Sequence, residues 1–296
     1  MTNVLINHNY LVLIIGVAVV FILACVYFCY FWGMLSHFRR TTGAKTQKEK
    51  DILTADVAYF CEIGQRERQE DSVYISQLDE YRDHGLFSCI ADGMGGLKEG
   101  HLISQYVVDE IEKLYPIDFD SHEYIARKIS QISRRIYDTF KLKGGSTLAL
   151  IHIFDNRLKF YSVGDSNVIL IRNDTATVLN YKQNYVGDLI RRLSKQNQST
   201  KDAYLDKDAA ALVDFIGKNN IRVIYTRDSL RLIDGDTLII CSDGVTDTLP
   251  VEHFAKYIDS SAKLTAKKIK ENVLNKKLKK QDNFSAVVIQ LKRSKF

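Results

Sequence analysis

Residues 86–96 read LFSCIADGMGG, and this stretch decides the fold because it joins an apolar run to an acidic, glycine-rich end. An apolar run of this length predicts a buried strand. Asp92 follows it directly, and the glycines after Asp92 allow a turn that bulkier residues do not tolerate. Taken alone, Asp-Gly after a strand is most often a hairpin turn. A strand that ends on a carboxylate can also hold a metal ligand rigidly.

The same pattern recurs along the chain, and this favours the metal interpretation. Residues 161–166 read YSVGDS and contain Asp165, and residues 238–247 read LIICSDGVTD and contain Asp243. Asp282 lies just before the apolar run 284–291. Several strands that each present an aspartate at one end predict a single carboxylate-lined site. Carboxylates without neighbouring His or Cys favour the hard cations Mg²⁺ and Mn²⁺, and the seven histidines show no zinc-binding spacing.

Such a site suits chemistry at phosphorus. Two cations bridged by one aspartate can activate a water and hold both oxygens of an in-line displacement. A phosphate also needs a fixed positive charge, and the guanidinium fork of arginine matches phosphate oxygens two at a time. Arg66 and Arg68 lie in the charged loop that leads to Glu70 and Asp71. Loop arginines are more often solvated, so on their own these two residues are weak candidates.

Strand and helix patterns are segregated along the chain. Residues 55–63 and 72–76 predict strands, and apolar residues at helical spacing predict helices at 102–114 and 123–142. A meander of strands is expected from 148 to 179, followed by helices at 186–193 and 208–216, strands at 221–225 and 238–241, a short helix at 251–258 and a lysine-rich surface helix within 263–280. This order favours an α+β sandwich over a doubly wound sheet.

The N-terminus predicts a membrane anchor. Tyr10–Trp32 is 23 residues without a charge, which is long enough to span a bilayer as a helix. A cleaved signal peptide is disfavoured because no positive charge precedes the apolar segment and no small-residue cleavage site follows it. A buried core helix is the remaining alternative. Residues 33–50 carry five basic residues and one acid, whereas residues 51–296 are close to neutral.

This charge distribution predicts both topology and compartment. A basic flank on one side of the span places that side in the cytoplasm, with Met1 outside. A surplus of positive charge beside the apolar segment, and not on the domain, argues for a membrane surface and against nucleic acid as a partner. The five cysteines are scattered and form no CxxC pair, which fits a reducing compartment.

Six short elements together resemble the type 2C family of metal-dependent serine/threonine protein phosphatases, over about 56–291. The elements are Arg-x-x-x-Glu-Asp at 66–71, Asp-Gly-x-Gly-Gly at 92–96, Gly-Ser-Thr at 145–147, Gly-Asp-Ser at 164–166, Ser-Asp-Gly-x-x-Asp at 242–247 and Asp-Asn at 282–283. One element alone is unspecific, but six in the family's order are a strong match. The expected parts are a tail (1–9), a transmembrane helix (10–32), a basic linker (33–50) and a phosphatase domain (51–296).

The resemblance implies a four-layer α/β/β/α sandwich of two antiparallel sheets with the site at one edge. It also implies that Asp92 bridges two Mn²⁺ or Mg²⁺ ions and that Arg66 binds the substrate phosphate. The remaining implied ligands are Asp243 and Asp282 for the first ion, the Gly93 carbonyl with Glu70 and Asp71 for the second, and Asp165 for a weaker third. Phosphorylated proteins are the implied substrates, with a serine/threonine kinase acting on the same proteins.

Two departures from the family pattern matter. Met94 stands where some relatives have a histidine that is suggested as a proton donor, and residues 181–184 read YKQN where relatives carry an acidic-His-Ser element. The alternative to an enzyme is a regulator of the same fold that binds a phosphoprotein or kinase at the membrane without turnover. Loss of metal-binding acids would favour the regulator, and none is lost.

Overall fold

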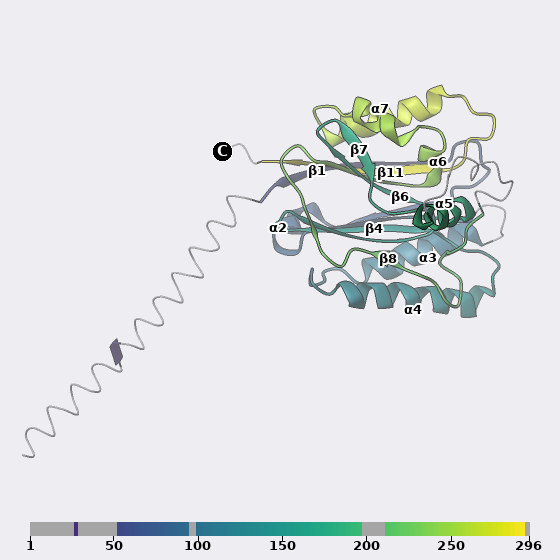
Figure 1. Cartoon of the computed structure of the whole chain (residues 1–296), viewed down its shortest axis with the longest axis horizontal. Helices are drawn as coiled ribbons and strands as arrows, with labels where there is room; N and C mark the ends of the chain where they lie inside the picture. The colour runs from purple at the N-terminus through teal and green to yellow at the C-terminus, as the bar shows by residue number, and fades with distance from the viewer. Residues whose placement is uncertain (1–26, 29–51, 95–98, 197–210, 294–296) are drawn as a thin grey trace, which may run out of the picture. The chain divides into compact units, whose positions relative to one another are not determined.

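The structure, a computed structural model, describes residues 27–28, 52–94, 99–196 and 211–293 (Figure 1). Leu53–Phe296 form one compact unit and Met1–Ile52 another. The predicted membrane span lies outside the described residues except at positions 27 and 28. Within the described ranges, no helix is both long and apolar enough to cross a membrane. The membrane anchor and the domain boundaries at residues 9, 32 and 50 therefore stay predictions.

Two antiparallel sheets stack face to face in the second unit (Figure 1). One has the order β1 (Thr54–Glu62), β11 (Phe284–Lys292), β10 (Thr237–Cys241), β6 (Asn167–Arg172) and β7 (Thr175–Val178). The other has the order β2 (Asp71–Ile75), β3 (Leu86–Asp92), β4 (Leu148–Phe154), β5 (Arg157–Val163) and β8 (Ile224–Tyr225), with β9 (Leu230–Arg231) also on β5. Alternate residues of both sheets, including Ile90, Ile151, Ile240 and Val287, fill the space between them. The predicted sandwich of two antiparallel sheets is confirmed.

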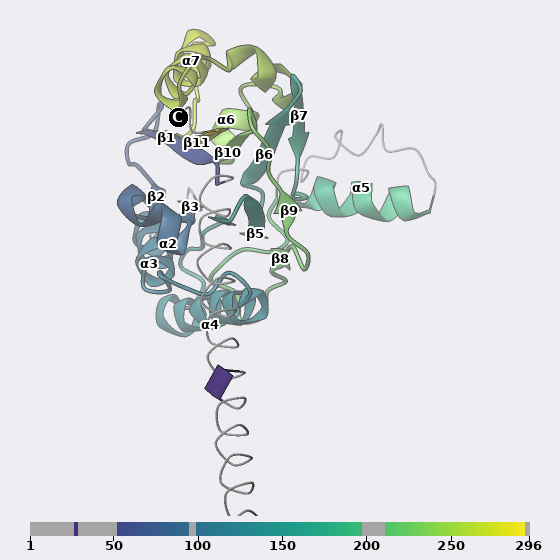
Figure 2. The same cartoon turned by 90° about the vertical axis from the view of Figure 1, so that its left-hand side faces the viewer.

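Helices cover the outer face of each sheet, as Figures 1 and 2 show. α3 (Gly100–Glu112) and α4 (His122–Phe140) pack their apolar stripes on the β3 side, where Ile103, Ile129 and Phe87 are fully buried. α7 (Ala262–Asn275) and the 3₁₀ helix η3 (Val251–Tyr257) cover the other sheet through Ile269 and Phe254. The helices form because their apolar residues recur every three or four positions, and burying those stripes makes the outer two layers.

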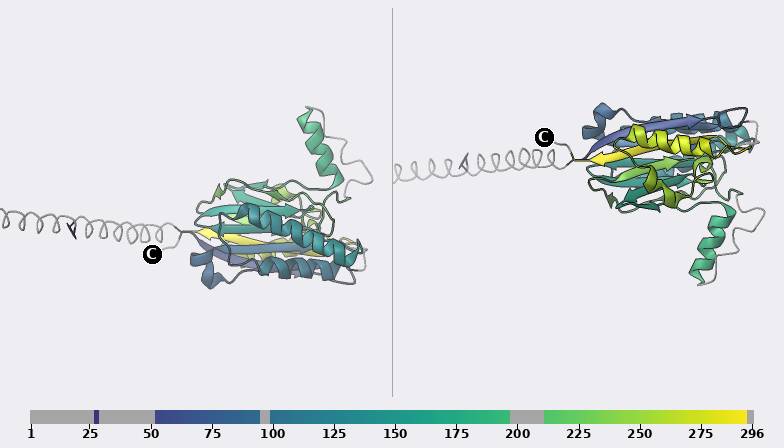
Figure 3. Two further views of the ribbon diagram at one scale, coloured as in Figure 1. Left: turned by 90° about the horizontal axis from the view of Figure 1, so that it is seen from below. Right: turned by 90° about the horizontal axis from the view of Figure 1, so that it is seen from above.

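One helix stands apart from these layers. α5 (Tyr185–Lys195) extends beside the sandwich (Figure 3), and only Val186 among its residues is buried. Its N-terminus is capped by Asn184, whose Oδ1 accepts a hydrogen bond from the Gly187 amide at 2.9 Å. The described ranges also contain the short helices η1 (Leu78–Glu80), α2 (Tyr81–His84) and α6 (Asp243–Thr246).

The helix predicted at 208–216 is wrong over its described part. Residues 211–216 are not helical, because Ile216 exchanges two backbone hydrogen bonds with Ser146, of 2.7 and 2.9 Å. Asn184 forms a similar bridge with Leu212. Pairing with distant segments has overridden the local helical pattern, which is the usual reason that such predictions fail. The strand predicted at 221–225 is limited to β8 at residues 224–225.

A buried histidine on β4 makes the fold sensitive to acid. His152 is fully buried, with its ring 5.0 Å from the Phe119 ring and 5.4 Å from the Phe87 ring. Burial lowers the pKa of His152 to about 4. The stability that comes from keeping this ring neutral is therefore complete above the unfolded-state pKa of about 6.5. It is lost as the pH falls from about 6.5 to about 4.

We therefore expect a difference in acid stability between wild type and His152→Gln. Between pH 7 and pH 4, the wild type should lose on the order of 3 kcal/mol more of its free energy of unfolding than the variant. The comparison is made by urea unfolding at matched pH values, so that all other titrating groups cancel. Parallel stability curves for the two proteins would contradict the assignment.

Candidate active site

Asp92 lies at the end of β3, where the two neighbouring strands hold its backbone. Its amide donates to Thr147 Oγ1 at 3.1 Å, and its carbonyl accepts from the Thr147 amide at 2.8 Å. The next residue, Gly93, donates to the Glu70 carbonyl at 3.0 Å. A Cβ at Gly93 would lie only 2.5 Å from the Gly100 carbonyl oxygen, so only glycine fits there. Gly93 is therefore required because the backbone of Gly100 passes close to it. The Asp-Gly pair does not form a hairpin turn.

Asp71 is brought directly opposite Asp92 by the pairing of β2 with β3. One carboxylate oxygen of Asp71 accepts a hydrogen bond from Ser242 Oγ at 2.9 Å. Its other oxygen, Oδ1, is buried and has no hydrogen-bond partner among the described residues. A buried carboxylate oxygen without a partner is costly, and this makes Oδ1 a natural ligand for a cation.

Asp243 and Asp165 reach the same place from the other sheet. Asp243 is the first residue of α6, just after β10, and its carboxyl group lies within hydrogen-bonding reach of that of Asp92. Asp165 is buried in the turn between β5 and β6 and interacts with Asp243. A Cβ at Gly244 would lie 2.1 Å from the Asn283 carbonyl oxygen, which explains the glycine after Asp243. Four aspartates therefore gather from four parts of the chain.

The pKa values of these carboxyl groups are raised by burial and by the neighbouring negative charges. Burial raises the pKa of Asp71 and of Asp165 to about 7. Burial, followed by the neighbouring carboxylates, also raises the pKa of Asp92 well above its usual range, and it raises that of Asp243. Lys182, which is partly exposed, is the positive charge that opposes this shift at both Asp165 and Asp243. Added positive charge is the missing component of this cluster.

Asp282 and Arg66 form the outer edge of the cluster. Arg66 Nη2 lies 2.6 Å from Asp282 Oδ2, and both side chains are more than 40% exposed. Glu70 lies nearby: burial raises its pKa, and the charge of Arg66 opposes that shift. Arg68 points elsewhere, to the His101 ring, with Nη1 3.0 Å from Nδ1. Of the two candidate arginines, the structure thus places Arg66 beside a predicted metal ligand.

The family model described as "Protein phosphatase 2C" matches residues 63–281, which is most of the chain. The chain belongs to the protein phosphatase 2C family. The resemblance drawn from the six sequence elements is confirmed, and with it the expectation of a metal-dependent protein phosphatase.

Several bacterial members of this family are similar to the chain. A putative protein phosphatase 2C-type from Streptococcus pyogenes is 24% identical over 217 residues, covering 70% of this chain and 85% of that protein. Protein phosphatase PhpP from Streptococcus pneumoniae is 23% identical over 72% of this chain and 87% of its own length. The crystal structure of Mycobacterium tuberculosis PstP/Ppp matches with a TM-score of 0.68 and 22% identity, covering 81% of this chain and all of that one. A further PstP catalytic-domain structure, described as a complex with two manganese ions, has a TM-score of 0.65.

The residues of this phosphatase 2C chain fit hard cations by their chemistry. The cluster offers carboxylate oxygens, one of them unpartnered, and no His or Cys side chain takes part in the described contacts between these aspartates. Among the described residues, no three His, Cys, Asp or Glu side chains lie close enough together to hold a metal ion. The carboxylates are instead adjacent in pairs, as in Asp71 opposite Asp92 and Asp92 beside Asp243. The assignment of Glu70, Asp71, Asp92, Gly93, Asp165, Asp243 and Asp282 as ligands stays a prediction.

A pocket of about 820 Å³ opens beside this cluster of the phosphatase. Its lining includes Asp165 and Asp243 together with Val186, Ile190 and Arg191 of α5. Lys182 lines it too, with Nζ 3.5 Å from Asp247 Oδ1. The sequence marked 181–184 only as a departure from the family pattern. The structure shows that this departure places a lysine beside the acidic cluster.

Asn283 is a site residue whose role the sequence did not reveal. Its Oδ1 accepts from the Glu70 amide at 2.9 Å, and its Nδ2 donates to the carbonyls of Ile63 and Arg68 at 2.8 and 3.1 Å. One buried amide side chain therefore fixes both ends of the loop that carries Arg66 and Glu70. The Asp-Asn motif was visible in the sequence, but its partners lie more than 200 positions away.

We expect Asn283→Ala to lower stability and to loosen this loop. The loss of three partly buried hydrogen bonds should cost about 2–3 kcal/mol of unfolding free energy. Asn283→Asp keeps the acceptor for the Glu70 amide but places a carboxylate oxygen against the carbonyls of Ile63 and Arg68, so it should be no more stable than Asn283→Ala. Chemical unfolding measures the order of the three proteins. Equal stability of Asn283→Ala and wild type would rule out the proposed fixing of the loop.

Proposed function

We propose that this protein is a membrane-anchored phosphatase that hydrolyses phosphoserine and phosphothreonine in proteins. The observation that carries the proposal is the adjacency of Asp71 to Asp92, of Asp92 to Asp243 and of Asp243 to Asp165, with all four pKa values raised. Family membership supports the reaction class, because the matched relatives are named as protein phosphatases. The carboxylate cluster explains why such a chain would depend on Mn²⁺ or Mg²⁺.

The protein's own residues divide the work of the reaction. When bound, two Mn²⁺ or Mg²⁺ ions would supply an activated water and charge neutralisation at the phosphate. Asp92, Asp243 and Asp282 would hold the first ion, and Asp92, the Gly93 carbonyl, Glu70 and Asp71 the second. Arg66 would orient the phosphate through its paired guanidinium N–H groups. Met94 has no proton to donate, so the leaving oxygen of the substrate must be protonated by water or another group.

The test is the release of phosphate from a phosphothreonine peptide by the purified chain. Rapid release with Mn²⁺ that stops on addition of chelator and returns with excess Mn²⁺ is the expected result. Tight binding of the phosphopeptide without turnover would support the alternative, a phosphatase-fold regulator that recognises a phosphoprotein or kinase at the membrane. A serine/threonine kinase that modifies the same substrates is the functional partner that the proposed reaction requires.

The proposed anchor has its own test. Residues 10–32 are uncharged and the adjoining basic residues all lie C-terminal to them, so the catalytic domain is expected in the cytoplasm. Protease added to intact cells or spheroplasts should leave the domain beyond residue 50 intact, and lysis should expose it. Digestion without lysis, or a mature protein that begins after residue 32, would contradict the proposed topology.

A further inference from the structure

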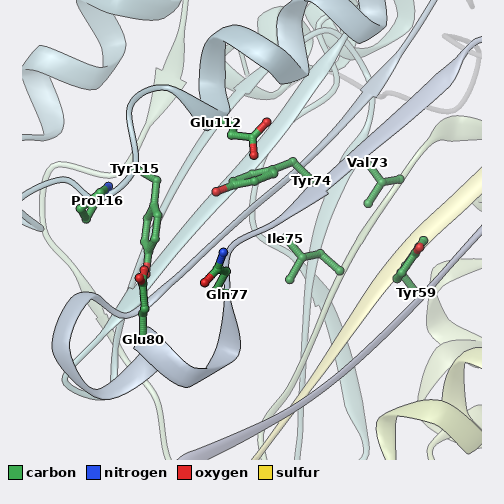
Figure 4. Close-up of a pocket in the computed structure, with 9 residues that line it drawn as sticks. All are labelled: Tyr59, Val73, Tyr74, Ile75, Gln77, Glu80, Glu112, Tyr115 and Pro116. Carbon is green, nitrogen blue, oxygen red and sulfur yellow. The ribbon is translucent and has the colours of Figure 1, made fainter.

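A second pocket lies on the edge of the sandwich, away from the carboxylate cluster. It has a volume of about 630 Å³ and is lined by residues of β1, β2, η1 and the C-terminal end of α3 (Figure 4). Its lining residues are Tyr59, Val73, Tyr74, Ile75, Gln77, Glu80, Glu112, Tyr115 and Pro116. The open space therefore follows an edge strand, β2, and is not enclosed within a sheet.

Aromatic rings and carboxylates are combined on the walls of this pocket. Figure 4 shows Glu112 over the Tyr74 ring and Glu80 beside the hydroxyl end of Tyr115. The closeness of these groups is reflected in Tyr74, whose pKa is raised to about 12 by burial and then by Glu112. Tyr115 is held in place by stacking on Phe87, with 6.0 Å between ring centroids. Ring faces next to carboxylates form a site that attracts organic cations.

The charged side chains that line this pocket are both acidic. Its lining contains Glu80 and Glu112 and no lysine or arginine among the described residues. The neighbouring Glu110, by contrast, is paired with both Lys113 and Arg135. The pocket is therefore acidic and aromatic, and complementary to a cation that comes from elsewhere.

The edge strand beside the pocket can also bind an extended segment. β2 is the terminal strand of its sheet and pairs only with β3 among the described residues. Val73 and Ile75 line the pocket, and Tyr59 on the neighbouring β1 is 61% exposed. A strand with one free edge offers backbone groups to an added strand, and alternate side chains of that strand then enter flanking pockets.

The same strand leads from this pocket to the carboxylate cluster. Asp71 is the first residue of β2 and lies opposite Asp92, whereas Ile75 is its last residue and lines the pocket. Four residues of extended chain cover about 13 Å. A polypeptide with its phosphorylated residue at the cluster would therefore place a side chain some four to six residues away in the pocket.

We propose that the groove formed by Tyr74, Tyr115, Glu80 and Glu112 binds a lysine or arginine side chain of the phosphoprotein, four to six residues from the phosphorylated residue. This inference rests on the proposed function. It adds a basic residue to the substrate class: the enzyme selects phosphorylated segments that carry a cation at a fixed spacing. We assign a basic side chain to this groove because the pocket is lined by two carboxylates and three tyrosines.

The test uses the full-length chain in detergent with Mn²⁺ and a set of phosphothreonine peptides. Each peptide carries one lysine at a different position, from six residues before to six residues after the phosphothreonine, and the reference peptide carries none. A lysine at one position, four to six residues away, should raise kcat/KM about 5- to 20-fold, mainly through KM. The gain should disappear in a Glu80→Gln/Glu112→Gln double variant that hydrolyses the reference peptide at the wild-type rate.

Two control variants separate the groove from a general charge effect. Asp109→Asn removes a charge from the same helix, α3, outside the pocket, and it should keep the lysine preference. Tyr74→Leu keeps both carboxylates and should lose most of the preference. Equal rates for all peptides, or a preference that persists in the double variant, would overturn the inference while leaving the phosphatase activity established. A preference that emerges only after the five basic residues of 33–50 are neutralised would assign the groove to the chain's own linker and also overturn it. Failure to hydrolyse the reference peptide would instead count against the proposed function.

Discussion

Asp92→Ala is expected to reduce phosphate release from a phosphothreonine peptide by at least about 1,000-fold at saturating Mn²⁺. Asp92 lies at the centre of the proposed site, opposite Asp71 and beside Asp243. Both proposed cations depend on it, and their electrostatic contribution to the reaction amounts to several kcal/mol. A loss of about 4 kcal/mol corresponds to about three orders of magnitude in rate.

The same variant separates a catalytic role from a structural one. Without metal, Asp92 lies among like charges, so its removal should leave the melting temperature of the metal-free protein unchanged or higher. Stabilisation by Mn²⁺, which wild type should show because the ion binds only the folded state, should be largely lost. Activity near that of wild type at equal Mn²⁺ would refute the two-cation site. A large loss of metal-free stability would instead indicate a structural role for the carboxylate.

Arg66→Ala is expected to lower kcat/KM for small phosphate esters by roughly 30- to 150-fold. This range corresponds to the loss of a charge-assisted, bidentate contact of about 2–3 kcal/mol. The effect should fall mainly on KM, because the proposed role of Arg66 is to bind phosphate. Its guanidinium also lies 2.6 Å from Asp282, a predicted metal ligand. Mn²⁺ affinity is therefore measured alongside activity in this variant.

Arg68→Ala is the matched control for this prediction. Arg68 occupies the same loop and carries the same charge, but it contacts the His101 ring and not an acid of the cluster. Its removal should change kcat/KM by only a few-fold. Mn²⁺ titration of both variants by calorimetry should match wild type. A larger catalytic loss in Arg68→Ala would show that the phosphate-binding arginine is the other member of the pair.

The sequence predicted most of the regular elements because their patterns are local. Alternating and continuous apolar runs placed the strands near Asp92 and Asp243 to within one or two residues, and the helices of residues 100–112 and 122–140 equally well. The sequence also predicted that the aspartates lie close together. That prediction used the observation that each aspartate follows or precedes a buried strand. Strands that stack in two sheets bring such ends together at one edge.

What the sequence could not predict depends on contacts between distant residues. The irregular path of residues 211–216 is fixed by backbone pairing with Ser146. The helical pattern in the sequence of this segment therefore gave a wrong prediction. The role of Asn283 depends on Ile63 and Glu70, which no periodicity connects to it. Lys182 looked like a departure from a motif, and only the folded chain places it next to Asp247. The acidic groove around Tyr74 joins four elements that carry no common motif.

The most direct test of the two-cation site is anomalous diffraction from crystals of the protein grown with Mn²⁺. We predict two strong peaks that share the Asp92 carboxylate, each within about 2.1 Å of at least one of its oxygens. Asp243 and Asp282 should contact one peak, and the Gly93 carbonyl should contact the other. A crystal at saturating Mn²⁺ with no peak at Asp92, or with peaks confined to the Glu80–Glu112 groove, would contradict the account.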